Sequence, residues 1–153
     1  MTVSAVVGKQ ALMDAAEPGG LGSTYAGNAV AVAGALAVLD VVQEEKLCDR
    51  AMMLGERMQA RFGAMKGRFP SIAEVRGLGA MVAVEFCRDG DPQQPADDIA
   101  GALKDEAARR GLLLLTCGVY GNVLRMMVPL TVPEALLEEG LDITEASLQA
   151  IGA

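Results

Sequence analysis

The sequence predicts an α/β chain in which a long apolar helix precedes a small α+β domain, a mostly antiparallel sheet covered by helices. Two observations carry this prediction. The composition changes abruptly at Glu44–Lys46, and from Glu45 onward helical and strand patterns follow one another as helix, two strands, helix, two strands, helix. We therefore place a domain boundary there, with residues 1–43 as the tail of a larger domain and 44–153 as the small domain.

The N-terminal part is too short to pack by itself. Val3–Val7 is a β-like apolar run, typical of the last strand of something larger, and Ala11–Glu17 can form a helical turn before Pro18. The helix expected from about Ala29 to Gln43 is apolar nearly all round, which is typical of a helix buried on several sides. Asn28 is a good N-cap for it.

The C-terminal part has clearer periodicity. An amphipathic helix is expected from Leu47 to about Phe69, with an apolar stripe of Leu47, Ala51, Leu54, Met58, Phe62 and Met65. Pro70 ends it. The strands expected next are Ile72–Arg76 and Met81–Phe86, joined through Gly77–Gly79, and later Leu112–Leu115 and Val123–Val128, around the loop 116–122.

The remaining segments are read from their turn and cap residues. Arg88–Pro95 reads as a surface loop because it is rich in Asp, Gly, Pro and Gln. Asp97 or Asp98 can cap a helix that runs to Arg110 and stops at Gly111. Pro133 starts a last helix, to about Ile151, at a position where its missing N–H costs nothing.

Composition and charge narrow the function. A net charge of −7 and a pI near 4.6 argue against nucleic acid or an anionic membrane as partners. Histidine is absent, so neither a Ser-His-Asp system nor a His-based metal site can be built, and no metal is expected. The longest uncharged apolar run, Ala29–Leu39, is too short for a bilayer, and the N-terminus lacks a basic region. A cytoplasmic protein is expected.

Cysteines and hydropathy add two expectations. Cys48, Cys87 and Cys117 are far apart and form no CxxC pair, which fits free thiols in a reducing compartment. The mean hydropathy of +0.31 exceeds what a free-standing soluble domain usually shows. Some apolar surface is therefore expected to meet another chain or a missing segment.

A glycine-rich loop at Gly19–Asn28 leads into the long apolar helix. Unpaired N–H groups and the helix dipole make such a junction a ready anion site, and Ser23 and Thr24 could add hydroxyl donors. Glycines also simply turn chains, and Asn28 caps helices. On loop chemistry alone, an ordinary turn and cap ranks ahead of an anion site.

Arg125 stands alone among the apolar residues of its strand. A guanidinium there suits a carboxylate held by two parallel hydrogen bonds. An internal ion pair with Glu74 or Glu85, or an edge position with the head group in water, is an equal alternative. Arg76 is a similar but weaker case, for which a structural role is expected. Lys46, Lys66 and Lys104 are expected to be solvated amines on polar helical faces, and nothing around Lys9 indicates the desolvation that a Schiff-base lysine needs.

Five stretches of the chain resemble the C-terminal part of the class III pyridoxal-phosphate aminotransferases, the ornithine/4-aminobutyrate type. They are Ser4-Ala-Val-Val-Gly8, Gly19-Gly-Leu-Gly-Ser-Thr-Tyr-Ala-Gly-Asn28, Val75-Arg-Gly-Leu-Gly79, Val82-Ala-Val-Glu-Phe86 and Gly111-Leu-Leu-Leu-Leu-Thr-Cys-Gly-Val-Tyr-Gly-Asn-Val-Leu-Arg125. They stand in family order and cover nearly the whole chain. The last is the most specific, and it favours the 4-aminobutyrate branch over the ornithine branch.

The resemblance implies fold type I, pyridoxal 5'-phosphate as cofactor, and amino acids and 2-oxo acids as substrates. It implies that Thr24, with the adjacent amides of Gly22 and Ser23, contacts the cofactor phosphate of the other subunit of a homodimer. It implies that Arg125 holds the α-carboxylate of glutamate or 2-oxoglutarate. On this reading the loop becomes a phosphate site.

The family's Schiff-base lysine lies in a Lys-Ser-x-x-Gly-Gly segment that this sequence lacks, and Lys9 matches a different family position. We therefore expect no catalytic lysine in the chain, no tight cofactor binding by the chain alone, and no activity without a missing N-terminal portion. The alternative is a non-catalytic dimerisation or interaction module, or a fragment of another ω-amino acid aminotransferase.

Overall fold

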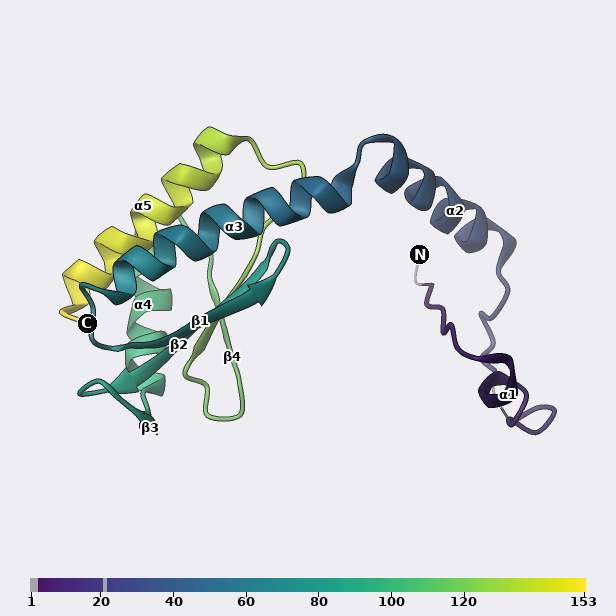
Figure 1. The fold of residues 1–153 in the computed structure, drawn as a ribbon, viewed down its shortest axis with the longest axis horizontal. Coiled ribbons are helices and arrows are strands. Elements are labelled where there is room, and N and C mark those ends of the chain that lie inside the picture. Colours follow the sequence, from purple (N-terminus) through teal and green to yellow (C-terminus); the bar gives the residue numbers. More distant parts are fainter. Residues whose placement is uncertain (1–2, 21) are drawn as a thin grey trace. The chain divides into compact units, whose positions relative to one another are not determined.

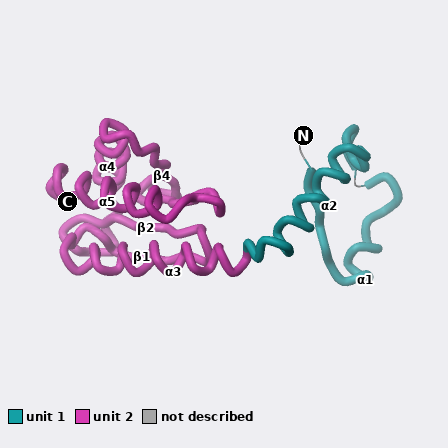
Figure 2. Tube along the Cα trace, turned by 90° about the horizontal axis from the view of Figure 1, so that it is seen from above, with its two compact units in different colours: residues 1–47 teal, residues 48–153 magenta. Residues whose placement is uncertain are grey.

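The computed structural model describes residues 3–20 and 22–153 and divides the chain into two compact units, Met1–Leu47 and Cys48–Ala153 (Figure 2). The division falls a few residues beyond the composition change at Glu44–Lys46. Each unit is described by itself. Assignment of the two parts to the large and small domains of a longer enzyme stays a prediction.

The first unit contains α1 (Gln10–Met13) and α2 (Ala29–Glu44). The Asn28 side chain accepts a hydrogen bond of 3.0 Å from the Ala31 N–H, which confirms it as the N-cap of α2. Ala31 is the buried residue of α2, and Val30, Leu36 and Val38 are exposed, so the first unit does not itself supply the burial that an apolar helix indicates. The short segments of this unit are too small to cover an apolar helix.

The expected strand at Val3–Val7 is wrong. These residues have no regular structure and are exposed. A strand needs hydrogen bonds from a neighbouring strand, and no strand among residues 3–20 and 22–153 pairs with this segment.

The second unit is an α+β layer, which confirms the predicted fold class (Figure 1). Its elements, in order, are α3 (Leu47–Lys66), β1 (Ile72–Leu78), β2 (Met81–Arg88), β3 (Asp91–Pro95), α4 (Asp97–Arg109), β4 (Leu115–Cys117), β5 (Val123–Met127) and α5 (Glu134–Ile151).

The sheet has the strand order β1-β2-β5-β4, and β3 also pairs with β2. Every pairing is antiparallel. Ala83 on the central strand β2 lies opposite Arg76 of β1 on one side and Arg125 of β5 on the other. Arg125 in turn lies opposite Leu115 of β4. This register sets two arginines in one row across the sheet.

One face of the sheet carries the core. Val82, Val84 and Phe86 of β2 and Leu124 of β5 are at most 1% exposed and pack in one cluster with α3, α4 and α5. The α3 stripe contributes Leu54, Met58, Phe62 and Met65, as predicted. Because side chains alternate along a strand, Met81, Arg125 and Met127 point to the opposite face, where they are exposed.

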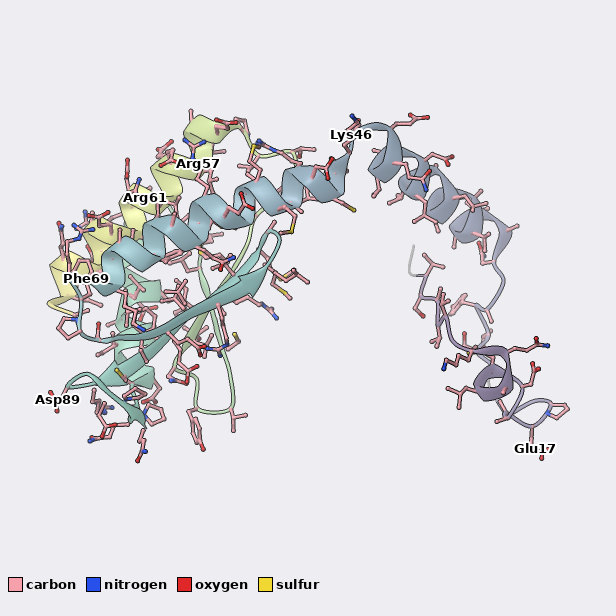
Figure 3. All side chains as sticks on the ribbon, in the orientation of Figure 1. Glu17, Lys46, Arg57, Arg61, Phe69 and Asp89 are labelled. Carbon is pink, nitrogen blue, oxygen red and sulfur yellow. The ribbon has the colours of Figure 1, made fainter. Side chains whose placement is uncertain are left out.

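Two contacts fix α3 over the sheet and against α5. Gly55 lies so close to the β1–β2 turn that a Cβ there would stand 2.0 Å from the Gly79 carbonyl oxygen. Arg57 and Arg61 of α3 form ion pairs with Glu138 of α5, that of Arg61 at 2.9 Å. Figure 3 labels both arginines on the side of α3 that faces α5.

Three predicted details of the second unit are wrong. Residues 88–95 form a hairpin ending in β3 rather than a loop, with a turn at Asp89 and Gly90, which both have positive φ. The N-cap of α4 is Ala96, without a side-chain cap bond, and Asp97 and Asp98 lie in the first turn, where the helix dipole favours them. The strand expected at 112–115 is β4, shifted towards the loop.

Within the part of the chain that the structure describes, none of the helices has the length and hydropathy needed to cross a membrane.

Candidate functional site

The glycine-rich loop presents donors to solvent. Gly22, Ser23 and Thr24 are exposed, whereas Leu21 lies outside the described residues. The Ser23 carbonyl accepts from the Ala26 N–H at 3.0 Å, and the Tyr25 carbonyl accepts from the Asn28 N–H at 3.3 Å, so the segment turns into α2. Among the described residues, no acceptor engages the N–H groups of Gly22, Ser23 or Thr24.

This donor set fits one end of pyridoxal phosphate. Unpaired N–H groups and hydroxyls are the groups that bind a phosphate, and no carboxylate lies within residues 22–28 to repel it. Among residues 3–20 and 22–153 there is no comparable place for the reactive carbon of that cofactor. Lys9, Lys46 and Lys66 are exposed, and Lys104 is half-buried with an ion pair of 3.2 Å to Asp105. None of the described lysines is buried among apolar side chains, the surroundings that a Schiff-base lysine needs.

Arg125 is in the middle of β5 on the open face of the sheet. It is exposed, and among the described residues it has no ion pair and no side-chain hydrogen bond. The two carboxylates that the sequence offered as partners, those of Glu74 and Glu85, instead hold Arg76, at 2.7 and 2.6 Å. The guanidinium of Arg125 is therefore open to a ligand.

Packing below the sheet fixes the backbone of Arg125. Its neighbours Leu124 and Met126 are buried in the core, so the register of β5 cannot slip without exposing them. Val123 faces the open side but is only 5% exposed, because the Gly118 turn lies against it.

Asn122 ties the start of β5 to β2. It is 2% exposed, and its side-chain amide donates to the Phe86 carbonyl at 2.8 Å and to Glu85 Oε1 at 3.4 Å. The Asn122 carbonyl accepts from the Phe86 N–H at 2.9 Å. This role of Asn122 was not predicted from the sequence, although an asparagine after Gly121 at the end of a loop is a signal for such a turn.

Arg76 has the structural role that the sequence predicted for it. Its guanidinium bridges Glu74 and Glu85, which lie directly opposite each other on β1 and β2. The hydrogen bond to Glu85 is the largest cause that raises the pKa of Arg76. A cation between two facing carboxylates relieves their repulsion.

Comparison with solved structures defines the class of the fold. An amine transaminase from an uncultivated Pseudomonas species, solved in its PLP-bound form, matches with a TM-score of 0.75 and 32% identity over 85% of this chain and 29% of its own. A Bacillus anthracis aminotransferase gives a TM-score of 0.76 at 22% identity, over 84% of this chain and 30% of that one, and supports the fold alone. The fold is that of part of a fold type I transaminase.

Comparison with known sequences defines the family. The family described as Aminotransferase class-III matches residues 1–148. The 5-aminovalerate aminotransferase DavT of Pseudomonas aeruginosa is 48% identical over 92% of this chain, and the 4-aminobutyrate aminotransferase GabT of Escherichia coli is 44% identical over 92%. The chain belongs to the class III aminotransferases, a family of pyridoxal-phosphate-dependent enzymes. It spans about a third (33%) of the length of each of these two relatives.

Proposed function

We propose that this chain supplies the C-terminal portion of a 4-aminobutyrate:2-oxoglutarate transaminase and acts only together with the rest of such an enzyme. Arg125 holds the α-carboxylate of glutamate or 2-oxoglutarate, and Gly22, Ser23 and Thr24 hold the cofactor phosphate of the partner subunit in a homodimer. The observation that carries the proposal is the free guanidinium of Arg125 on the open face of the sheet.

The physical argument for Arg125 is that its site is preorganised. A planar guanidinium on a strand of fixed register offers two parallel N–H donors to a carboxylate without reordering the backbone. Exposed Met81 and Leu115 flank the position and would accept the apolar part of a small acid. When bound in the whole enzyme, pyridoxal phosphate supplies the electron sink for amino-group transfer.

The substrate is a small ω-amino acid. Relatives named for 4-aminobutyrate and for 5-aminovalerate match with 44% and 48% identity, so sequence similarity does not separate the two. We assign 4-aminobutyrate on the Gly111–Arg125 stretch, and 5-aminovalerate is the alternative within the same reaction.

A chimera tests the proposal. The C-terminal third of E. coli GabT is replaced by this chain, and transamination of 4-aminobutyrate and of 5-aminovalerate by 2-oxoglutarate is measured. We expect turnover, a KM for 2-oxoglutarate raised about 10- to 100-fold by Arg125→Gln, corresponding to the loss of a charge-assisted pair, and weaker cofactor retention in Thr24→Ala. A chimera whose KM is unmoved by Arg125→Gln would overturn the role of Arg125.

The chain alone is expected to be inactive. Incubated with pyridoxal phosphate and borohydride, it should show neither transamination nor a stoichiometric adduct at one lysine. A reducible adduct at Lys9 accompanied by turnover would contradict this expectation.

A non-catalytic dimerisation or interaction module is a second candidate, favoured by the exposed apolar residues of α2. Sizing chromatography separates the two candidates. A monodisperse monomer that captures no transaminase chain would contradict this second candidate.

A further inference from the structure

The open face of the sheet places one carboxylate between two arginines. Glu85 of β2 lies opposite Glu74 of β1 and opposite Val123 of β5, two residues along the strand from Ala83. Ala83 is the residue opposite both Arg76 and Arg125. Glu85 is therefore the diagonal cross-strand neighbour of each arginine, one on either side, and diagonal neighbours are within reach of long side chains.

In the structure Glu85 bonds one of these arginines and not the other. Its Oε2 accepts from Arg76 at 2.6 Å, and its Oε1 accepts from the Asn122 amide at 3.4 Å. Both carboxylate oxygens are thus engaged, and the Glu85 side chain is 28% exposed. Among the described residues, Arg125 has no carboxylate on it, although Glu85 is the nearest acid by strand register.

We propose that Arg76 is a positioning residue that holds Glu85 away from Arg125 and so keeps Arg125 free for a substrate carboxylate. The inference rests on the proposed role of Arg125 and assigns Arg76 to the same carboxylate site. If the Arg76 guanidinium is removed, Glu85 loses its strongest partner and turns to the arginine on its other side. The internal carboxylate then competes with the external one for the same planar fork.

Charge alone does not explain the arrangement, because Glu74 and Glu85 carry the same charge and both contact Arg76. They differ in position. Glu74 lies on β1, with β2 between it and β5, whereas Glu85 lies on the strand adjacent to Arg125. Glu74 therefore serves as a matched control for Glu85.

The test uses the full 153-residue chain, labelled with ¹⁵N, and follows the Nε–Hε resonance of Arg125 by NMR during titration with 2-oxoglutarate at constant ionic strength. Variants are Arg76→Gln, the double variants Arg76→Gln/Glu85→Gln and Arg76→Gln/Glu74→Gln, and Arg125→Gln. Arg88→Gln removes a different exposed arginine, paired with Asp98, and controls for net charge. Amide spectra show whether each variant is folded.

We expect Arg76→Gln to raise the Kd for 2-oxoglutarate about two- to fivefold, because the competing ion pair between Glu85 and Arg125 would be exposed and therefore weak. Adding Glu85→Gln should restore the wild-type Kd, whereas adding Glu74→Gln should not. An unchanged Kd in Arg76→Gln, or rescue by Glu74→Gln, overturns the inference but leaves Arg125 as the residue that binds the carboxylate. The Arg125→Gln variant, which lacks this resonance, is titrated through its backbone amide shifts, and amide-shift titrations equal to those of the wild type overturn the proposed function itself.

Discussion

Replacing Gly55 by alanine should destabilise the second unit, although alanine is the better helix former. The added Cβ would stand 2.0 Å from the carbonyl oxygen of Gly79 and 2.6 Å from its carbonyl carbon, where ordinary van der Waals contact begins near 3.4 Å. Either α3 or the β1–β2 turn must move by about 1.4 Å to relieve the first of these contacts. Both atoms are backbone, so no side chain can rotate away.

The magnitude follows from two opposed effects. Overpacking a close contact costs about 1–3 kcal/mol, and replacing a helical glycine by alanine returns about 1 kcal/mol. Because the contact is backbone, we take the upper end and expect a net loss of about 2 kcal/mol, or roughly 10 °C in Tm for a unit of this size.

Gly63 provides the matched control for this measurement. It is in the same helix, it is exposed, and a Cβ added to it meets nothing within 4 Å. Gly63→Ala should therefore raise the stability by up to about 1 kcal/mol. Thermal and urea unfolding of the two variants measure the difference. If Gly55→Ala melts at or above Gly63→Ala, the close approach of α3 to the turn is refuted.

Three further results are expected. Asn122→Ala removes the buried amide that bonds Phe86 and Glu85, and it should cost about 1–3 kcal/mol in urea unfolding; an unchanged midpoint would contradict its tying role. Hydrogen bonds from Arg57 and, to a smaller extent, from Arg50 lower the pKa of Glu134. The stability that Glu134 contributes is therefore present above the carboxyl pKa of the unfolded chain and is lost as the pH falls through the lower pKa of the folded chain. The Tm measured from pH 7 down to about pH 3 should fall less in Glu134→Gln than in the wild type, and parallel curves would refute this. Burial raises the pKa of the Cys87 thiol, which is 1% exposed, whereas Cys48 is exposed, so native alkylation should label Cys48 first by mass spectrometry.

The sequence predicted the parts of the fold that depend on local periodicity. The Leu54–Met65 stripe defined α3 and its buried side because residues three and four apart share a helix face. Asn28 and Gly111 marked helix ends by chemistry that acts within one turn. These features need no knowledge of distant residues.

The missed strand β3 depends on pairing with the preceding strand β2 and not on a residue pattern of its own. Its sequence, Asp91-Pro-Gln-Gln-Pro95, has the composition of a loop, and its two prolines are tolerated because β3 is an edge strand on β2. The Asp89-Gly90 dipeptide was the available signal, since its residues readily take the positive φ of a tight hairpin turn. For α2 the apolar pattern predicts burial, whereas the described residues of the first unit leave Val30, Leu36 and Val38 exposed.

The site was only partly predictable for the same reason. The sequence identified Arg125 as an unusual charge but left an internal ion pair with Glu74 or Glu85 open. Strand register decides which carboxylate can reach Arg125, because Glu85 has two diagonal arginine neighbours, Arg76 and Arg125, whereas Glu74 has only Arg76. The competing carboxylate could not be identified before the strands were paired.

The two proposed binding elements depend on this chain to different degrees. Arg125 stands on a strand whose register is fixed by buried neighbours in the same unit, so its geometry does not require a further protein segment. Thr24 is on an exposed loop whose described hydrogen bonds are local turns. Carboxylate binding should therefore be measurable in the isolated chain, whereas phosphate binding by the loop should require the protein surface that completes it. Detectable phosphate affinity that is lost in Thr24→Ala of the isolated chain would contradict this division.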